Sequence, residues 1–157
     1  MLVARKSKRR TNMLRTVGIA HFTLGVSDIA RSVAFYRDIV GLELISLNGD
    51  RMAFFRSAKD IIVLVKSEHA IEAAAKAPEQ IHQAFLVEER DFEDSVRFLE
   101  SHGVPILKME RREDFDSVFR SRSAYFRDPD GNVLEIADCA TIAHRPVEKK
   151  REALTTH

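Results

Sequence analysis

Apolar and polar positions follow two different periods along the middle of this chain, and the two periods alternate. Residues 17–26, VGIAHFTLGV, form a continuous run of β-formers. Residues 29–39 then place apolar side chains at the spacing of one helical face. The members of that face are Ile29, Val33, Phe35, Tyr36 and Ile39. The pattern predicts a strand followed by a helix.

Turn and cap residues bound these elements. Ser27 or Asp28 can cap the start of the helix, and Gly41 suits the left-handed residue that ends it. Three short strand-like stretches follow, with NGDR at 48–51 as a hairpin signal. They read LELISLN at 42–48, RMAFFR at 51–56 and DIIVLVK at 60–66. One unit is therefore strand–helix–strand–strand–strand.

The second half of the chain repeats this unit. Two segments each begin with a histidine, contain Asp-x-x-x-Ser-Val-x-Phe and reach a glycine before an extended stretch. They read HFTLGVSDIARSVAFYRDIVGLELI from His21 and HQAFLVEERDFEDSVRFLESHGVPIL from His82. MAFFR at 52–56 likewise resembles SAYFR at 123–127. Because such repeats fix architecture, we predict an α+β fold of two tandem βαβββ modules.

The length of 157 residues suits a single domain with its own core. We place that domain at residues 17–142, with modules at about 17–66 and 80–138 joined by residues 67–79. The first 16 residues hold six basic residues and no acid, and we expect a disordered basic N-terminal arm at 1–16. Residues 143–157 read as a polar C-terminal tail.

Composition narrows the function class. The chain is 45% hydrophobic and 31% charged, which is ordinary for a soluble globular protein. A net charge of +1 favours neither nucleic acid nor an anionic membrane as partner. No apolar run approaches the roughly 20 residues of a membrane span. The single cysteine, Cys139, excludes an internal disulfide and fits a reducing compartment, so we expect a cytoplasmic protein.

A carboxylate interrupts the last apolar strand. Residues 122–136, RSAYFRDPDGNVLEI, predict two strands around a tight turn, with Glu135 among apolar neighbours. A charge in that setting costs several kcal/mol unless a cation or hydrogen-bond donors compensate it. His21 and His82 begin equivalent strands of the two repeats, so pseudo-symmetry favours corresponding faces for them. The alternative is a purely structural role, in which the two histidines are hydrogen-bonded in the core and the glutamate is ion-paired.

The motifs HFTLGVSDIARSVAFYRDIVGLEL, IHQAFLV and YFRDPDGNVLEI together resemble the vicinal oxygen chelate superfamily. It includes glyoxalases, extradiol dioxygenases, fosfomycin-resistance enzymes and bleomycin-binding proteins. The resemblance implies a glyoxalase-like fold in which mixed sheets curl into incomplete barrels around a metal. It also implies that His21, His82 and Glu135 bind that metal. Two imidazoles and a carboxylate form the facial triad of Fe²⁺ sites; we favour Fe²⁺ or Mn²⁺ and keep Zn²⁺ and Ni²⁺ as alternatives.

Further positions narrow the chemistry. Glyoxalase I of this superfamily has a fourth ligand, a glutamate in the first module, where this chain has Val63 or Leu64. Tyr125 lies on the strand beside Glu135, and we expect it to be catalytic, as donor to a bound oxyanion or as acid. Thr23 and Ser123 match polar positions of the fosfomycin-resistance enzymes, which implies substrate binding. Lys108 and the nearby arginines offer charge for an anionic substrate.

The sequence leaves three functions open. The facial triad favours a metal-dependent enzyme of extradiol dioxygenase type. A fosfomycin-type transferase or hydrolase, or a lyase or isomerase of the superfamily, is the first alternative. A ligand-sequestering protein without catalysis is the second. The resemblance further implies a homodimer whose subunits share each site, so that His21 meets His82 and Glu135 of the partner subunit.

Overall fold

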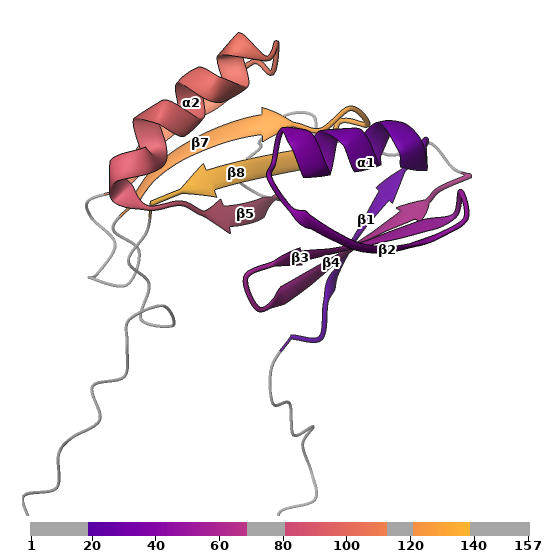
Figure 1. The fold of residues 1–157 in the computed structure, drawn as a ribbon. Coiled ribbons are helices and arrows are strands. Elements are labelled where there is room, and N and C mark those ends of the chain that lie inside the picture. Colours follow the sequence, from indigo (N-terminus) through magenta and orange to yellow (C-terminus); the bar gives the residue numbers. More distant parts are fainter. Residues whose placement is uncertain (1–18, 69–80, 113–120, 139–157) are drawn as a thin grey trace, which may run out of the picture.

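The computed structural model describes residues 19–68, 81–112 and 121–138 (Figure 1). These ranges contain two copies of the predicted unit. The predicted N-terminal arm (1–16), most of the connection at 67–79 and the tail at 143–157 lie outside the described residues. Within the described ranges, no helix is long and apolar enough to cross a membrane.

The first module follows the predicted order. Asp28 caps its helix by accepting a hydrogen bond from the Arg31 amide at 2.9 Å, and Gly41 adopts a φ of 80° just beyond the helix end. Its elements are β1 (Phe22–Val26), α1 (Ile29–Asp38), β2 (Glu43–Asn48), β3 (Met52–Ser57) and β4 (Asp60–Lys66). The sheet order is β1-β4-β3-β2, with β1 and β4 parallel and the other pairs antiparallel.

The second module repeats this topology. Its elements are β5 (Gln83–Leu86), the 3₁₀ turn η1 (Glu89–Asp91), α2 (Phe92–Ser101), β6 (Lys108–Arg112), β7 (Ser121–Arg127) and β8 (Val133–Ala137). The sheet order is β5-β8-β7-β6, again with one parallel pair, β5 and β8. Two four-stranded mixed sheets that do not close into barrels confirm the predicted α+β class.

Pairing registers define which residues of the two modules correspond. Thr23, two residues after His21, pairs with Val63; Ala84, two residues after His82, pairs with Glu135. Val63 therefore occupies in the first module the place that Glu135 occupies in the second. The same register equates Phe54 with Tyr125, because Phe54 on β3 pairs with Val63 and Tyr125 on β7 pairs with Glu135.

Alternate strand residues build one hydrophobic core shared by both modules. Each helix lies along one face of its own sheet (Figure 1), and the side chains between helix and sheet are buried. Burying a large apolar side chain such as Phe55 or Phe126 contributes about 1.5–3 kcal/mol. The core includes Leu24, Val26, Tyr36, Phe55 and Leu64 of the first module and Phe92, Val96, Ala124, Phe126 and Leu134 of the second.

The turn between β7 and β8 ties the modules together through polar contacts. The Asp128 carboxylate accepts hydrogen bonds from the Tyr36 hydroxyl at 2.9 Å and from the Asn132 side chain at 2.8 Å. Asn132 also donates to the Gly25 carbonyl at 2.9 Å. Burial, and next the Asp128 charge, raise the pKa of the Tyr36 phenol far above its ordinary value, so the phenol stays a donor.

Asp130 completes this set from the same turn. Its carboxylate accepts hydrogen bonds from the Ser27 hydroxyl at 2.6 Å and from the Arg31 guanidinium at 2.7 Å. Partial burial acts to raise the pKa of Asp130, but the hydrogen bonds from Ser27 and Arg31 outweigh it and hold that pKa below its usual value. We call Asp128, Asp130 and Asn132, with their first-module partners Gly25, Ser27, Arg31 and Tyr36, the inter-module clasp.

We predict that Asp128→Ala lowers the free energy of unfolding by about 2–4 kcal/mol, because it leaves the buried Tyr36 hydroxyl without this acceptor. Urea unfolding measures the change. Asp50→Ala is the control, because Asp50 is exposed and pairs with Lys66 at the surface, so the unfolding midpoint should hardly move. Equal losses in the two variants would contradict a stabilising role for the clasp.

Candidate metal centre

The face of the second sheet that points away from α2 carries polar side chains. Ala124 and Phe126 on β7 and Ile136 on β8 belong to the core, so the residues that alternate with them face the other way. Those alternate residues are Ser123, Tyr125 and Glu135. This alternation places all three side chains on the face that forms the candidate site.

Glu135 has a partner in the folded chain. Its Oε2 lies 2.7 Å from Nε2 of His82, and the two side chains are 7% and 21% exposed. The register explains the contact: Glu135 pairs with Ala84, two residues from His82, so both side chains leave the sheet on the same side. Within one chain this contact gives the buried carboxylate a partner, as in the ion-paired alternative that the sequence also allowed.

Tyr125 lies directly beside this pair. Its backbone pairs with Glu135 across β7 and β8, and its ring meets the His82 ring edge to face at a centroid distance of 5.3 Å. The side chain is fully buried. Its hydroxyl donates to Oε2 of Glu110 on β6 at 3.3 Å, a long hydrogen bond. The phenol thus joins His82 and Glu135 to β6.

Ser123 is buried without a hydrogen-bond partner. It is 1% exposed, and its hydroxyl contacts no donor or acceptor among the described residues. Native proteins rarely leave a buried hydroxyl unsatisfied, and such groups often mark a ligand or an ion. Ser123 is two residues from Tyr125 on the same face, so this orphaned oxygen supports the predicted substrate-binding role.

His21 and Thr23 lie on the other sheet. His21 immediately precedes β1, Thr23 pairs with Val63 within the first sheet, and both are exposed. Among the described residues of one chain, no three histidine, cysteine or acidic side chains gather to hold a metal. A single chain therefore brings together two of the three predicted ligands, His82 and Glu135, and His21 as the third stays a prediction.

The donor set suits a divalent cation. An imidazole nitrogen and a carboxylate oxygen 2.7 Å apart can both turn to one ion, and the pair is largely withdrawn from solvent. Mixed nitrogen and oxygen donors of this kind bind Fe²⁺, Mn²⁺, Zn²⁺ and Ni²⁺ alike. The residues present therefore fit a metal without selecting one.

The first module offers no fourth ligand at the equivalent place. The register puts Val63 opposite Thr23, as it puts Glu135 opposite Ala84. Of the two residues that the sequence left open there, Val63 is thus the counterpart of Glu135, and Leu64 belongs to the core. A valine side chain has no donor atom, so this position cannot bind metal.

One neighbour in the site was missed from the sequence. Glu110 on β6 pairs with Ser123, and Lys108 pairs with Tyr125, so both point to the same face as Glu135. Lys108 Nζ lies 3.4 Å from Oε1 of Glu110. The sequence analysis named Lys108, together with the nearby arginines, as charge for an anionic substrate. Its alternation with Glu110 two residues later was the signal that both reach the site.

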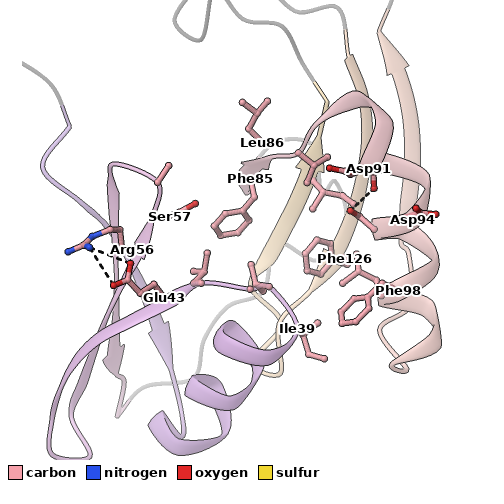
Figure 2. A pocket seen from close by; sticks show the side chains of 18 residues that line it. Ile39, Glu43, Arg56, Ser57, Phe85, Leu86, Asp91, Asp94, Phe98 and Phe126 are labelled. Atoms are coloured by element: carbon pink, nitrogen blue, oxygen red, sulfur yellow. Dashed lines mark hydrogen bonds and ion pairs between the residues drawn. The ribbon is translucent and has the colours of Figure 1, made fainter.

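A separate groove lies between the modules. It has a volume of about 770 Å³ and is lined from the end of α1, the turn after β3, and from β5 and α2 (Figure 2). Neither His82, Tyr125 nor Glu135 belongs to its lining. In Figure 2 its Arg56 pairs with Glu43, at 3.3 Å, rather than pointing an unsatisfied charge into the groove. The donor groups, and not this groove, define the candidate site.

Comparison with known proteins gives one family and consistent relatives. The family described as Glyoxalase/Bleomycin resistance protein/Dioxygenase superfamily matches residues 18–136. A metallothiol transferase FosB of Staphylococcus epidermidis is 35% identical over 119 residues, which are 76% of this chain and 81% of the relative. A glutathione transferase FosA of Serratia marcescens is 34% identical over 116 residues, 74% of this chain and 77% of the relative.

Solved structures show the same fold. A lactoylglutathione lyase from Agrobacterium tumefaciens superposes with a TM-score of 0.63 at 25% identity, covering 78% of this chain and 94% of that one. The fosfomycin resistance protein FosX from Listeria monocytogenes, as a mutant in complex with Mn(II) and 1S,2S-dihydroxypropylphosphonic acid, gives 0.65 at 24% identity, over 80% of this chain and 92% of its own. The second likeness, at that identity, concerns the fold alone.

We predict that His82→Ala weakens Mn²⁺ binding at least about a hundredfold, because it removes one of two donors held 2.7 Å apart. Calorimetric titration of metal-free protein with Mn²⁺ measures the change. His102→Ala is the matched control, because His102 is exposed and hydrogen-bonds the Phe98 carbonyl at the end of α2. Unchanged Mn²⁺ affinity in His82→Ala would remove His82 from the site.

Proposed function

Because the chain belongs to the Glyoxalase/Bleomycin resistance protein/Dioxygenase superfamily, we propose that it is a divalent-metal-dependent enzyme that transfers a small thiol onto an electrophilic small molecule. The substrate class is a compact molecule with neighbouring oxygen atoms, one of them an oxyanion, and fosfomycin is the compound to test first. The observation that carries this proposal is the His82–Glu135 pair in a chain whose relatives at 34–35% identity are thiol transferases.

The relatives change the order of the sequence-based hypotheses. The facial triad by itself favoured ring-cleaving dioxygenase chemistry, because two imidazoles and a carboxylate leave positions open for oxygen. The relatives named above are a metallothiol transferase and a glutathione transferase instead. This supports the transferase alternative and gives no support to the dioxygenase. A ligand-sequestering protein is disfavoured for the same reason, since both relatives are enzymes.

A lyase of the glyoxalase type is the second candidate. The observation in its favour is the likeness to a lactoylglutathione lyase, at 25% identity and a TM-score of 0.63. Against it stands Val63, which occupies the place of the fourth ligand that glyoxalase I of this superfamily uses. We therefore rank it below the transferase.

A metal held by His82 and Glu135 would supply Lewis-acid polarisation of a substrate oxygen. The chain's own side chains would then bind and orient the substrate. Lys108, two strands from Glu135 on the same face, offers a positive charge for the oxyanion of the substrate. The Ser123 hydroxyl, which has no hydrogen-bond partner among the described residues, can hydrogen-bond to that oxyanion.

Thiol transfer to an epoxide is balanced without an oxidant. The thiolate sulfur attacks a ring carbon, the carbon–sulfur bond forms as the carbon–oxygen bond breaks, and the released alkoxide takes a proton. Tyr125 lies beside His82 and Glu135 with its hydroxyl inside the site, so it is placed for hydrogen bonding to that oxygen. Its full burial keeps competing water away from the reacting atoms.

We further propose that two chains build each site. His21 and Thr23 are exposed on the first sheet, while His82 and Glu135 form an incomplete ligand set on the second. Pairing the first sheet of one subunit with the second sheet of another would complete two equivalent sites by one two-fold operation.

The transferase proposal predicts a thiol adduct of fosfomycin when Mn²⁺-loaded protein is incubated with fosfomycin and glutathione or cysteine. Phosphorus NMR and mass spectrometry detect the product. Glu135→Gln should lower the rate at least about a hundredfold, because it removes a charged metal ligand. Glu43→Gln, an exposed strand glutamate paired with Arg56, should leave the rate unchanged. Oxygen uptake with catechols, and no adduct with either thiol, would overturn the proposal in favour of a dioxygenase.

The shared-site proposal predicts complementation between two inactive variants. His21→Ala and Glu135→Ala should each lack activity, whereas unfolding and refolding them together should restore about a quarter of the sites, all in mixed dimers. Differently tagged chains allow mixed dimers to be purified and assayed. Purified mixed dimers without activity would show that His21 and Glu135 do not act across subunits.

A further inference from the structure

We propose that Arg122 is a positioning residue for substrate binding: it holds the start of β7 from the opposite face of the sheet, and so keeps the Ser123 hydroxyl where it can meet the substrate oxyanion. The inference deepens the proposed function, and it rests on that function in taking Ser123 as a group that contacts the ligand. It starts from the contacts of one arginine on the second sheet.

The Arg122 side chain points away from the candidate site. Side chains alternate along β7, so Arg122 lies on the face that α2 covers, opposite to Ser123 and Tyr125 (Figure 1). Its guanidinium carbon lies 4.6 Å from the centroid of the Phe92 ring on α2, and its Nη1 donates to Oε1 of Glu93 at 3.0 Å. Arg122 is therefore not the cation that receives an anionic substrate.

Asp138 joins Arg122 to the end of β8 through both oxygens of its carboxylate. Oδ1 accepts a hydrogen bond from the Arg122 backbone amide and Oδ2 accepts one from Nε, both at 2.6 Å. The Asp138 amide donates to the Arg122 carbonyl at 3.2 Å. The Asp138 side chain is 6% exposed, so solvent screens this pair less than it screens a surface pair. We call Arg122 and Asp138 the β7 clamp.

The third nitrogen of the guanidinium reaches the connection that follows β5. Nη2 donates to the Glu89 carbonyl in η1 at 2.7 Å. Arg122 thus ties β7 to β8, to η1 and to α2, and uses a different nitrogen for each contact. A lysine cannot make these contacts together, because all its donors are on one nitrogen. The arrangement requires the planar fork of an arginine and not only a positive charge.

The first module keeps the backbone part of this arrangement but not its side chains. Sheet register equates Arg51 with Arg122, and Lys66 with Asp138, because each pair lies one residue beyond the last rung between its two strands. The Lys66 amide donates to the Arg51 carbonyl at 2.8 Å. Two cations cannot form an ion pair, and Lys66 Nζ pairs with Asp50 instead, at 2.7 Å. The repeat itself therefore does not require the clamp, which is found where the candidate metal donors are.

The clamp lies next to the one buried hydroxyl that has no partner among the described residues. Ser123 is 1% exposed, and its pairing with Ala137 is the rung directly before the clamp. Because no hydrogen bond within the described chain directs this hydroxyl, its place depends on the backbone of β7. Binding groups must be held to within a fraction of an ångström to be effective, so the support behind them matters.

A double-mutant cycle tests whether Arg122 acts through Ser123. Isothermal titration of Mn²⁺-loaded, full-length protein with fosfomycin, without thiol, measures the affinity of the wild type, Arg122→Lys, Ser123→Ala and the double variant. The same titrations with inorganic phosphate supply an oxyanion that no thiol can attack. Titration of the metal-free proteins with Mn²⁺ measures metal affinity. Arg97→Lys is the matched control, because Arg97 is exposed on α2 and pairs with Asp94.

We expect Arg122→Lys and Ser123→Ala each to weaken oxyanion binding by roughly tenfold, the effect of losing a hydrogen bond to a charged group. The double variant should bind about as weakly as Ser123→Ala alone, because no hydroxyl remains to be positioned. Mn²⁺ affinity should stay as in the wild type, since His82 and Glu135 are unchanged. Arg97→Lys should match the wild type in every titration.

Equal effects of Arg122→Lys with and without the Ser123 hydroxyl would overturn the inference, and so would a parallel loss of Mn²⁺ affinity, which indicates general loosening of the fold. If Arg122→Lys does not fold, Asp138→Asn takes its place in the cycle, because it removes only the acceptor of Nε. Wild type that binds neither fosfomycin nor phosphate would also overturn the inference. The expected coupling in a protein that forms no thiol adduct would contradict the proposed function and leave the role of Arg122 in place.

Discussion

The cost of burying one carboxylate organises the functional half of this molecule. Glu135 is 6% exposed in the middle of an otherwise apolar strand, and the chain meets that cost by bringing His82 to 2.7 Å. The contact requires β5 to lie parallel to β8 with Ala84 opposite Glu135. That arrangement in turn requires the crossover through α2, which takes the chain from β5 at one edge of the sheet to β6 at the other. The contact between His82 and Glu135 therefore depends directly on the topology of the second module.

Duplication produced two similar sheets with different surfaces. At the places of Glu135 and Tyr125 in the second module, the first has Val63 and Phe54. The first sheet therefore keeps the architecture and, of the three predicted metal donors, only His21. This difference suits the proposed site between two subunits. There the more apolar face of one sheet would cover the polar face of the other and exclude water. It also explains why the two modules of one chain do not form two equivalent sites.

A polar clasp holds the two modules of one chain together. The sequence predicted a tight turn within residues 122–136, but not the partners of that turn. Those partners are Tyr36 and Arg31, about a hundred residues away on α1, and the turn hydrogen-bonds to both. Because β7 and β8 enter and leave this turn, the clasp also fixes the strands that carry Tyr125 and Glu135.

The sequence by itself determined the repeat, the order of elements and the candidate donors, because periodicity, caps and turn residues are local properties of a chain. Only the tertiary structure decided that Val63 rather than Leu64 is the counterpart of Glu135, that Glu110 reaches Tyr125, and that Asp128 contacts Tyr36. Each depends on strand register or on the packing of distant segments. A shift of one residue turns every side chain of a strand to the other face, so a pattern of residue types cannot specify such contacts alone.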